Sequence, residues 1–233
     1  MAFLQPPSAR QPIFRAPPVV LWLIAGLAAA HAARVLQPIA RANALVFQYG
    51  LVPAPYSPAY LQSRIANAGS VWDQALPFVS YMAVHGDWTH LTINCLWLLA
   101  FGPVVARRFG ASLFLGFFVV CGVAAAVTYI AFNWGSESPV VGASGAISGL
   151  MAAAIRMRPG PAPLVSLWSR PVLMFTLVWS VINLVTGVTG LGMVTQGVAV
   201  AWQAHLGGFL AGLLLVGPFD ALGRWLRAPS KDR

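Results

Sequence analysis

Charged side chains are scarce in this sequence: only 8% of its 233 residues are charged, whereas 58% are hydrophobic. An ordinary soluble domain carries roughly 25% charged residues. The apolar runs recur along the whole chain and leave no polar segment long enough to fold by itself. The composition therefore excludes an ordinary soluble protein and indicates a membrane protein with one membrane domain.

Cysteine is also scarce, because the chain has only two, Cys95 and Cys121, and both lie inside apolar runs. A cysteine in such a run packs as a small hydrophobic side chain more often than it forms a disulfide bond. We therefore predict no disulfide and no metal site, and we expect no cofactor.

Acidic residues are the rarest charged class, with five Asp and Glu against 14 Lys and Arg and a formal net charge of +9. A basic excess indicates nucleic-acid binding when the cations share one surface. Here most cations flank apolar runs at alternate ends, as the positive-inside rule describes. We therefore predict cytoplasmic termini, contact with anionic lipid and no nucleic-acid partner. The cations assigned to the cytoplasmic side are Arg10, Arg15, Arg107, Arg108, Arg156, Arg158, Arg170, Arg224, Arg227, Lys231 and Arg233.

Long hydrophobic runs are abundant, and hydropathy predicts six helical spans. The fourth is short, because a helix from Ser144 to Arg156 rises only about 18 Å, against a hydrocarbon core of roughly 30 Å. The predicted fold class is an all-α membrane protein, a six-helix bundle with cytoplasmic termini and a short fourth helix that starts at Ser144. The predicted spans are 19–33, 90–106, 112–132, 144–155, 172–191 and 198–219.

One membrane domain, residues 17–220, is expected between a cytoplasmic tail at 1–16 and a basic cytoplasmic tail at 221–233. The first span is similar to a signal peptide, but no cleavage site with a polar domain follows it, so we expect it to be retained. Residues 35–87 are too many for a simple turn, and we predict a large outer loop there. Its prolines interrupt any long helix, and aromatic residues such as Trp72 suit the headgroup region.

Polar side chains inside the spans are functional candidates, because each needs a partner or water at that depth. The second, fourth and sixth spans run in the same direction, so their depths can be compared by residue count. Asn94, Ser144 and His205 each lie roughly 18 to 20 Å from the cytoplasmic ends of their helices. His90, one turn from Asn94, shares its helix face. Four polar side chains from three helices therefore share one layer.

The chemistry that this layer allows is a Ser–His pair with donors for an oxyanion. Ser144 begins a helix, whose free backbone N–H groups can face a developing negative charge. His205 is the candidate base, because imidazole titrates near neutrality and a serine hydroxyl needs a proton acceptor. His90 and Asn94 are then candidate oxyanion donors. All five carboxylates lie outside the predicted apolar layer, so we predict a dyad rather than a triad.

Plainer interpretations exist for each residue taken alone. A single G-x-S-G in a membrane helix is more often a packing contact of small residues. His90 alone is more often a capping or interfacial residue, and Asp87 is expected to cap its helix. The common depth of the four side chains favours a site instead. By contrast, we interpret Asn183 and Thr186 as interhelical hydrogen-bonding residues, and His31 as an interfacial residue without a partner.

Three motifs connect these residues: H-x4-H-x3-N, G-x-S-G and A-H-x2-G-x3-G. In this order, and with this topology, they resemble the rhomboid intramembrane serine proteases over roughly residues 17–220. The motif residues are His85, His90, Asn94, Gly142, Ser144, Gly145, Ala204, His205, Gly208 and Gly212. Many members also carry an aromatic residue where this chain has Ser148, and Trp202 or Phe209 is a candidate to replace it.

The resemblance implies that Ser144 is the nucleophile, that His205 is the general base, and that Asn94, His90 and the Ser144 amide form the oxyanion hole. His85 is given a supporting role. Supporting roles also follow for the glycines that permit close backbone approach, which are Gly142, Gly145, Gly208 and Gly212.

The function implied by the resemblance is cleavage of transmembrane segments of single-pass or multi-pass membrane proteins near their outer ends. We expect an integral membrane protein of a bacterial plasma membrane, with a mitochondrial membrane as the alternative. A catalytically silent rhomboid-like protein that binds transmembrane segments for quality control is the alternative function. A small-solute transporter is a weaker third, because no paired half-repeats are evident.

Overall fold

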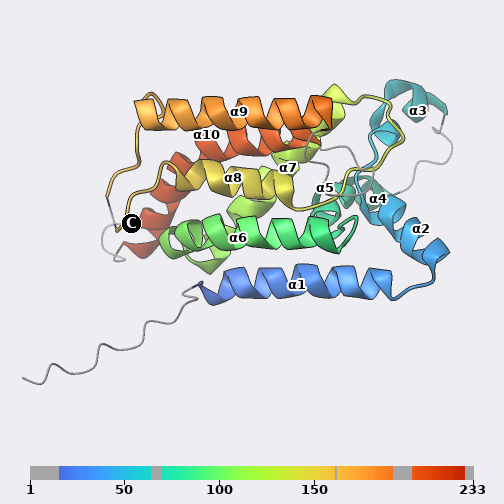
Figure 1. Cartoon of the computed structure of the whole chain (residues 1–233), viewed down its shortest axis with the longest axis horizontal. Helices are drawn as coiled ribbons and strands as arrows, with labels where there is room; N and C mark the ends of the chain where they lie inside the picture. The colour runs from blue at the N-terminus through green and yellow to red at the C-terminus, as the bar shows by residue number, and fades with distance from the viewer. Residues whose placement is uncertain (1–15, 64–69, 161, 191–200, 229–233) are drawn as a thin grey trace, which may run out of the picture.

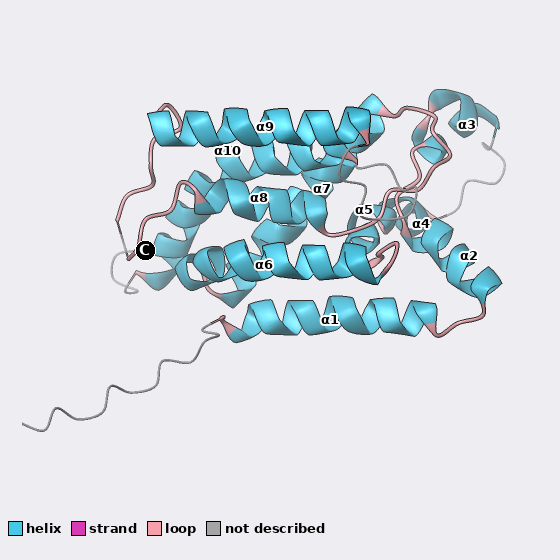
Figure 2. Ribbon diagram, in the orientation of Figure 1, coloured by secondary structure: helices cyan, strands magenta, loops and turns pink. Residues whose placement is uncertain are grey.

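The computed structural model describes residues 16–63, 70–160, 162–190 and 201–228. Their regular structure is helical (Figure 2). Within these ranges the only β-type backbone pairing is an isolated antiparallel bridge between Leu51 and Val140. The predicted all-α class is therefore confirmed. Among the described residues, five helices are long and apolar enough to cross a membrane, namely α1 (Pro18–Val35), α6 (Trp88–Phe109), α7 (Ala111–Phe132), α9 (Arg170–Thr189) and α10 (Trp202–Arg227).

The fourth predicted span is the short helix α8 (Ser144–Ala154), which begins at Ser144 as expected. It lies in the middle of the bundle and contacts α6, α7 and α10 (Figure 1). Every residue from Gly145 to Ala153 is buried. A helix of this length is too short to cross the bilayer. Its first backbone N–H groups, which have no acceptor within the helix, therefore lie inside the protein.

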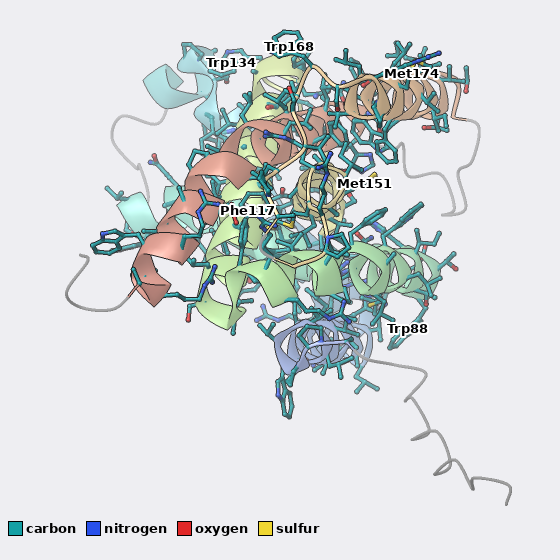
Figure 3. All side chains as sticks on the ribbon, turned by 90° about the vertical axis from the view of Figure 1, so that its left-hand side faces the viewer. Trp88, Phe117, Trp134, Met151, Trp168 and Met174 are labelled. Atoms are coloured by element: carbon teal, nitrogen blue, oxygen red, sulfur yellow. The ribbon has the colours of Figure 1, made fainter. Side chains whose placement is uncertain are left out.

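The outer helices are attached more loosely. α1 packs on α6, and α9 packs on α10 (Figure 1). Figure 3, which looks along the bundle, shows Phe117 and Met151 in the interior, and Trp88 and Met174 at the periphery. The many exposed apolar side chains of α9 suit contact with lipid.

The predicted outer loop folds into short helices at one end of the bundle (Figure 1). They are α2 (Ile39–Tyr49), η1 (Ala54–Tyr56), α3 (Pro58–Ser63), α4 (Val71–Ala75), α5 (Pro77–Ser80) and η2 (Tyr81–Ala83). Pro58 and Pro77 each stand at the first position of a helix, where a missing N–H costs no hydrogen bond. Ser70 and Asp73 form a capping box on α4.

Arginines gather at the opposite end of the bundle, where α6, α8 and α10 end and α9 begins (Figure 1). The described members of this group are Arg107, Arg108, Arg156, Arg158, Arg170, Arg224 and Arg227. Arg34 and Arg41 lie at the α2 end instead. This is the distribution that the predicted topology requires, although most of the tail at 1–16 and residues 229–233 lie outside the described residues.

Helix α10 ends later than the predicted sixth span. The apolar run was expected to end at 219 and to give way to a basic tail at 221–233, but α10 continues to Arg227. Hydropathy falls at Asp220, but the helix continues beyond it. Arg224, one turn later, donates a hydrogen bond to the Asp220 carboxylate and supports this helical turn. Charged residues with good helix propensity extend the helix beyond the apolar segment.

Asp220 also joins three segments at this end of the bundle. Its carboxylate is buried and accepts hydrogen bonds from Arg108 Nε (2.7 Å) and Nη2 (3.0 Å). Arg108 in turn donates to the backbone carbonyl oxygens of Gly160 and Ala162, in the connection between α8 and α9. The ion pair therefore holds α6, α10 and that connection together, and its several hydrogen bonds offset the cost of burying charge.

Candidate active site

The chain enters α8 through a segment that is fixed on both sides. Val140 exchanges backbone hydrogen bonds with Leu51, and the Gly142 N–H donates to the Tyr81 carbonyl oxygen (2.9 Å). Gly142 has φ +112°, a conformation that residues with a Cβ rarely adopt. This backbone turn places Ser144 at the start of α8, where its side chain is half-buried.

Ser144 and His205 lie together, as the depth comparison predicts. His205 Nε2 is 2.8 Å from Ser144 Oγ. The histidine stands in the first turn of α10, which begins at Trp202, and its side chain is also half-buried. Both residues therefore lie in the first turn of their helices, at the same end of the α8–α10 pair.

The second nitrogen of His205 has a partner that the sequence interpretation missed. Asn183 Oδ1 on α9 lies 2.8 Å from His205 Nδ1, and Asn183 Nδ2 donates to the Trp202 carbonyl oxygen (2.9 Å). The interhelical hydrogen bond predicted for Asn183 is confirmed, although its bond to His205 was not foreseen, whereas the one predicted for Thr186 is wrong, because its hydroxyl donates to the backbone of its own helix. Counting along α9 from Arg170 would have revealed the Asn183–His205 bond, since Asn183 lies roughly 20 Å from that end, at the depth of His205.

His90 and Asn94 on α6 face the chain just before Ser144. A Cβ built on Gly142 would lie 2.7 Å from His90 Nε2 and 3.9 Å from Asn94 Nδ2. Asp87 caps α6 as expected, because its carboxylate accepts from the His90 N–H. Asn94 is buried, and its Nδ2 donates to the His90 carbonyl oxygen (2.9 Å). The predicted layer thus contains donors next to the backbone that leads into the serine.

His85 lies behind His90, with their ring centroids 5.2 Å apart. It is completely buried, and burial together with the neighbouring His90 lowers the pKa of His85 to about 3. The ring is therefore neutral at pH 7. The supporting role predicted for His85 stays a proposal, and the geometry that favours it is this edge-to-face contact with His90.

His31, which was expected to have no partner, packs against two other rings. It is buried on α1, with its ring centroid 4.6 Å from Trp88 and 6.4 Å from His85. Arg34, one turn later, donates to the backbone carbonyl oxygens of His85 and Gly86. The outer end of α1 is therefore tied to the segment that carries His85, a contact between distant parts of the sequence.

Comparison with known proteins identifies the family of the chain. The Rhomboid domain family matches residues 69–219 of the chain. The chain belongs to the rhomboid family. RHOMBOID-like protein 5 of Arabidopsis thaliana is 26% identical over 155 residues, 66% of this chain and 46% of that protein. Rhomboid protease AarA of Providencia stuartii is 29% identical over 154 residues, 58% of this chain and 52% of that protein. The chain spans about half the length of these relatives.

In this rhomboid, Ser148 turns back to its own helix: its Oγ donates to the Ser144 carbonyl oxygen (2.8 Å). Neither suggested aromatic ring contacts His205. Phe209 stacks on Trp179, with centroids 4.1 Å apart, and Trp202 contacts Phe132. Among the ring contacts of the described residues, none involves His205.

The glycines of the rhomboid motifs bring α8 and α10 into backbone contact. A Cβ on Gly208 would overlap the Gly145 carbonyl oxygen, and one on Gly212 would overlap the Gly149 carbonyl oxygen. The close packing predicted for the G-x-x-x-G pair is therefore present, and its neighbour is α8. No side chain separates the two helices at the level of Ser144, so their backbone spacing sets the Ser144–His205 distance.

Replacing Gly208 with alanine should force α10 away from α8, because the new methyl group meets backbone that cannot rotate aside. We expect a loss of about 1–3 kcal/mol in stability, seen as a lower unfolding temperature in detergent. Gly217→Ala on the same helix is the matched control, since a Cβ there meets nothing within 4 Å. It should be neutral or slightly stabilising. Equal unfolding temperatures for both variants would contradict the tight contact.

Proposed function

We propose that this rhomboid is an intramembrane serine endopeptidase that cleaves transmembrane segments of other membrane proteins near their outer ends. The observation that carries the proposal is the 2.8 Å contact between Ser144 Oγ and His205 Nε2. A serine hydroxyl at helix-packing sites has no need of an imidazole partner, whereas a nucleophile requires one. A silent member is free to lose either residue, and this chain has kept both in contact.

In the proposed reaction, His205 Nε2 accepts the Ser144 hydroxyl proton while Oγ attacks the carbonyl carbon of the substrate. The resulting tetrahedral intermediate carries a negative oxygen. His205 then delivers the proton to the leaving amine, which departs and leaves an acyl-enzyme. A water molecule, activated by the same nitrogen, hydrolyses the ester and restores the serine.

The intermediate oxygen is held by three donors in this proposal. The Ser144 N–H belongs to the first turn of α8, where backbone N–H groups have no intrahelical acceptor. His90 Nδ1 accepts from the Gly86 N–H (3.4 Å), so the proton of its neutral ring resides on Nε2, which faces Gly142. Asn94 has a second Nδ2 proton available beyond its bond to His90.

The position of Ser144 in the bundle supports a cut near the outer end of a substrate helix. Ser144 lies at the end of α8 nearer to the short helices of the outer segment (Figure 1). A peptide bond reaches Ser144 only if the substrate helix unwinds there, and Gly or Pro makes unwinding less costly. We accordingly propose substrates with helix-weakening residues near the outer membrane surface.

We also propose that the rhomboid domain spans residues 17–220. The proposed location of the protein is a bacterial plasma membrane.

The proposal predicts that cleavage depends on both members of the pair. Purified protein in liposomes should cut a reporter transmembrane segment, and Ser144→Ala or His205→Ala should abolish product formation on gels. Ser148→Ala serves as the control, since Ser148 bonds within α8 and should leave turnover within a few-fold of wild type. Unchanged cleavage by Ser144→Ala would refute the assignment of the nucleophile.

Asn94→Ala should lower kcat by about 10- to 1,000-fold, because an oxyanion donor acts mainly in the transition state. Asn133→Ala is a matched control: Asn133 Nδ2 makes the same bond within its helix, to the Tyr129 carbonyl oxygen (2.9 Å), at the end of α7. Steady-state kinetics on the reporter would measure both. Equal losses in the two variants would show that Asn94 contributes only to helix structure.

A further inference from the structure

We propose that Asn183 is a positioning residue that holds His205 as the base, so that Ser144, His205 and Asn183 act as a hydrogen-bonded triad. The inference rests on the proposed protease function and revises the expected dyad. Each link is short: 2.8 Å from Ser144 Oγ to His205 Nε2, 2.8 Å from His205 Nδ1 to Asn183 Oδ1, and 2.9 Å from Asn183 Nδ2 to the Trp202 carbonyl oxygen.

The direction of every hydrogen bond follows from the last link. A backbone carbonyl oxygen only accepts, so the Asn183 atom facing Trp202 must be the NH₂ group. Asn183 then presents its oxygen to His205 Nδ1, which must carry the ring proton. His205 Nε2 is thereby left with a lone pair directed at Ser144 Oγ. The tautomer that a general base needs is therefore set by a carbonyl at the start of α10.

Asn183 is fixed well enough to perform this role. The residue is buried, with only 7% of its surface exposed. Next to it, Gly187 lets α9 approach the Trp202 side chain, because a Cβ there would overlap that ring. Toward the other end, Trp179 on α9 stacks on Phe209 of α10 (Figure 3 shows α9 at the edge of the bundle). Contacts on both sides of Asn183 thus hold α9 against α10.

No aromatic support competes for this role among the described residues. Ser148 is occupied by the Ser144 carbonyl oxygen, and the Phe209 ring stacks on Trp179. The side-chain hydrogen bonds of His205 are those to Ser144 and Asn183. Asn183 is therefore the group that fixes the rotation of the ring about its side-chain bonds.

A neutral amide suits this depth better than a carboxylate. An ionised side chain is costly to hold within the bilayer, and a triad carboxylate would add that cost. Asn183 retains the acceptor oxygen without the charge. When His205 gains the serine proton, Nδ1–H remains a donor and the bond to Asn183 Oδ1 becomes charge-assisted. The link therefore persists, and strengthens, during catalysis.

The test compares Asn183→Leu, which removes the acceptor with similar volume, and Asn183→Asp, whose neutral carboxyl group keeps an acceptor oxygen for His205 and a hydroxyl donor for the Trp202 carbonyl oxygen. Thr186→Val on the same helix is the matched control, because the Thr186 hydroxyl donates to backbone carbonyl oxygens of α9 itself, those of Ile182 and Asn183. Reporter cleavage in liposomes gives kcat and KM, and unfolding temperature is measured in parallel. We expect Asn183→Leu to lower kcat about 10- to 100-fold at unchanged KM, Asn183→Asp to recover most of it, and Thr186→Val to match wild type.

An Asn183→Leu variant with wild-type kcat would overturn the inference and leave the proposed protease function intact. So would equal kcat losses in Asn183→Leu and Asn183→Asp that follow their unfolding temperatures, because that result assigns Asn183 to helix packing alone. An inactive wild type, or cleavage that persists in Ser144→Ala, would instead overturn the proposed function and this inference with it.

Discussion

The backbone contact between α8 and α10 is the constraint on which the site depends. Gly145 and Gly149 on one helix meet Gly208 and Gly212 on the other, with no room for a Cβ between them. In the apolar interior of a membrane, helices associate through close packing rather than through the hydrophobic effect, and small residues permit it. This contact brings two first turns to the same level, and a serine and a histidine standing there meet at 2.8 Å.

Hydrogen-bond satisfaction at membrane depth adds the second constraint. A polar group in the hydrocarbon layer needs a partner, and Ser144, His205 and Asn183 find one another across three helices. The carbonyl oxygen of Trp202 orients Asn183, Asn183 orients His205, and His205 meets Ser144. The same requirement that stabilises the buried polar side chains also selects the tautomer that proton transfer needs.

The sequence was sufficient to predict which side chains of the site meet when they lie on helices that run in the same direction. Counting residues from the basic ends placed Ser144 and His205 at one depth, and the structure brings them together. The Asn183–His205 bond was missed because α9 runs the other way and was left out of that count. The end of α10 was misplaced because hydropathy measures apolar content, whereas an Asp220–Arg224 pair one turn apart continues a helix. Burial of His31 against His85 and Trp88 depends on how the outer segment folds, which local patterns do not encode.

The central claim is that Ser144 is a nucleophile activated by His205. Its most direct measurement is the site of covalent attachment of a fluorophosphonate, a reagent that phosphonylates activated serines, mapped by mass spectrometry on protein in liposomes. The account predicts one adduct, on the peptide containing Ser144, and its disappearance in His205→Ala. An adduct confined to another serine, or an equally rapid reaction of Ser144 in His205→Ala, would contradict it.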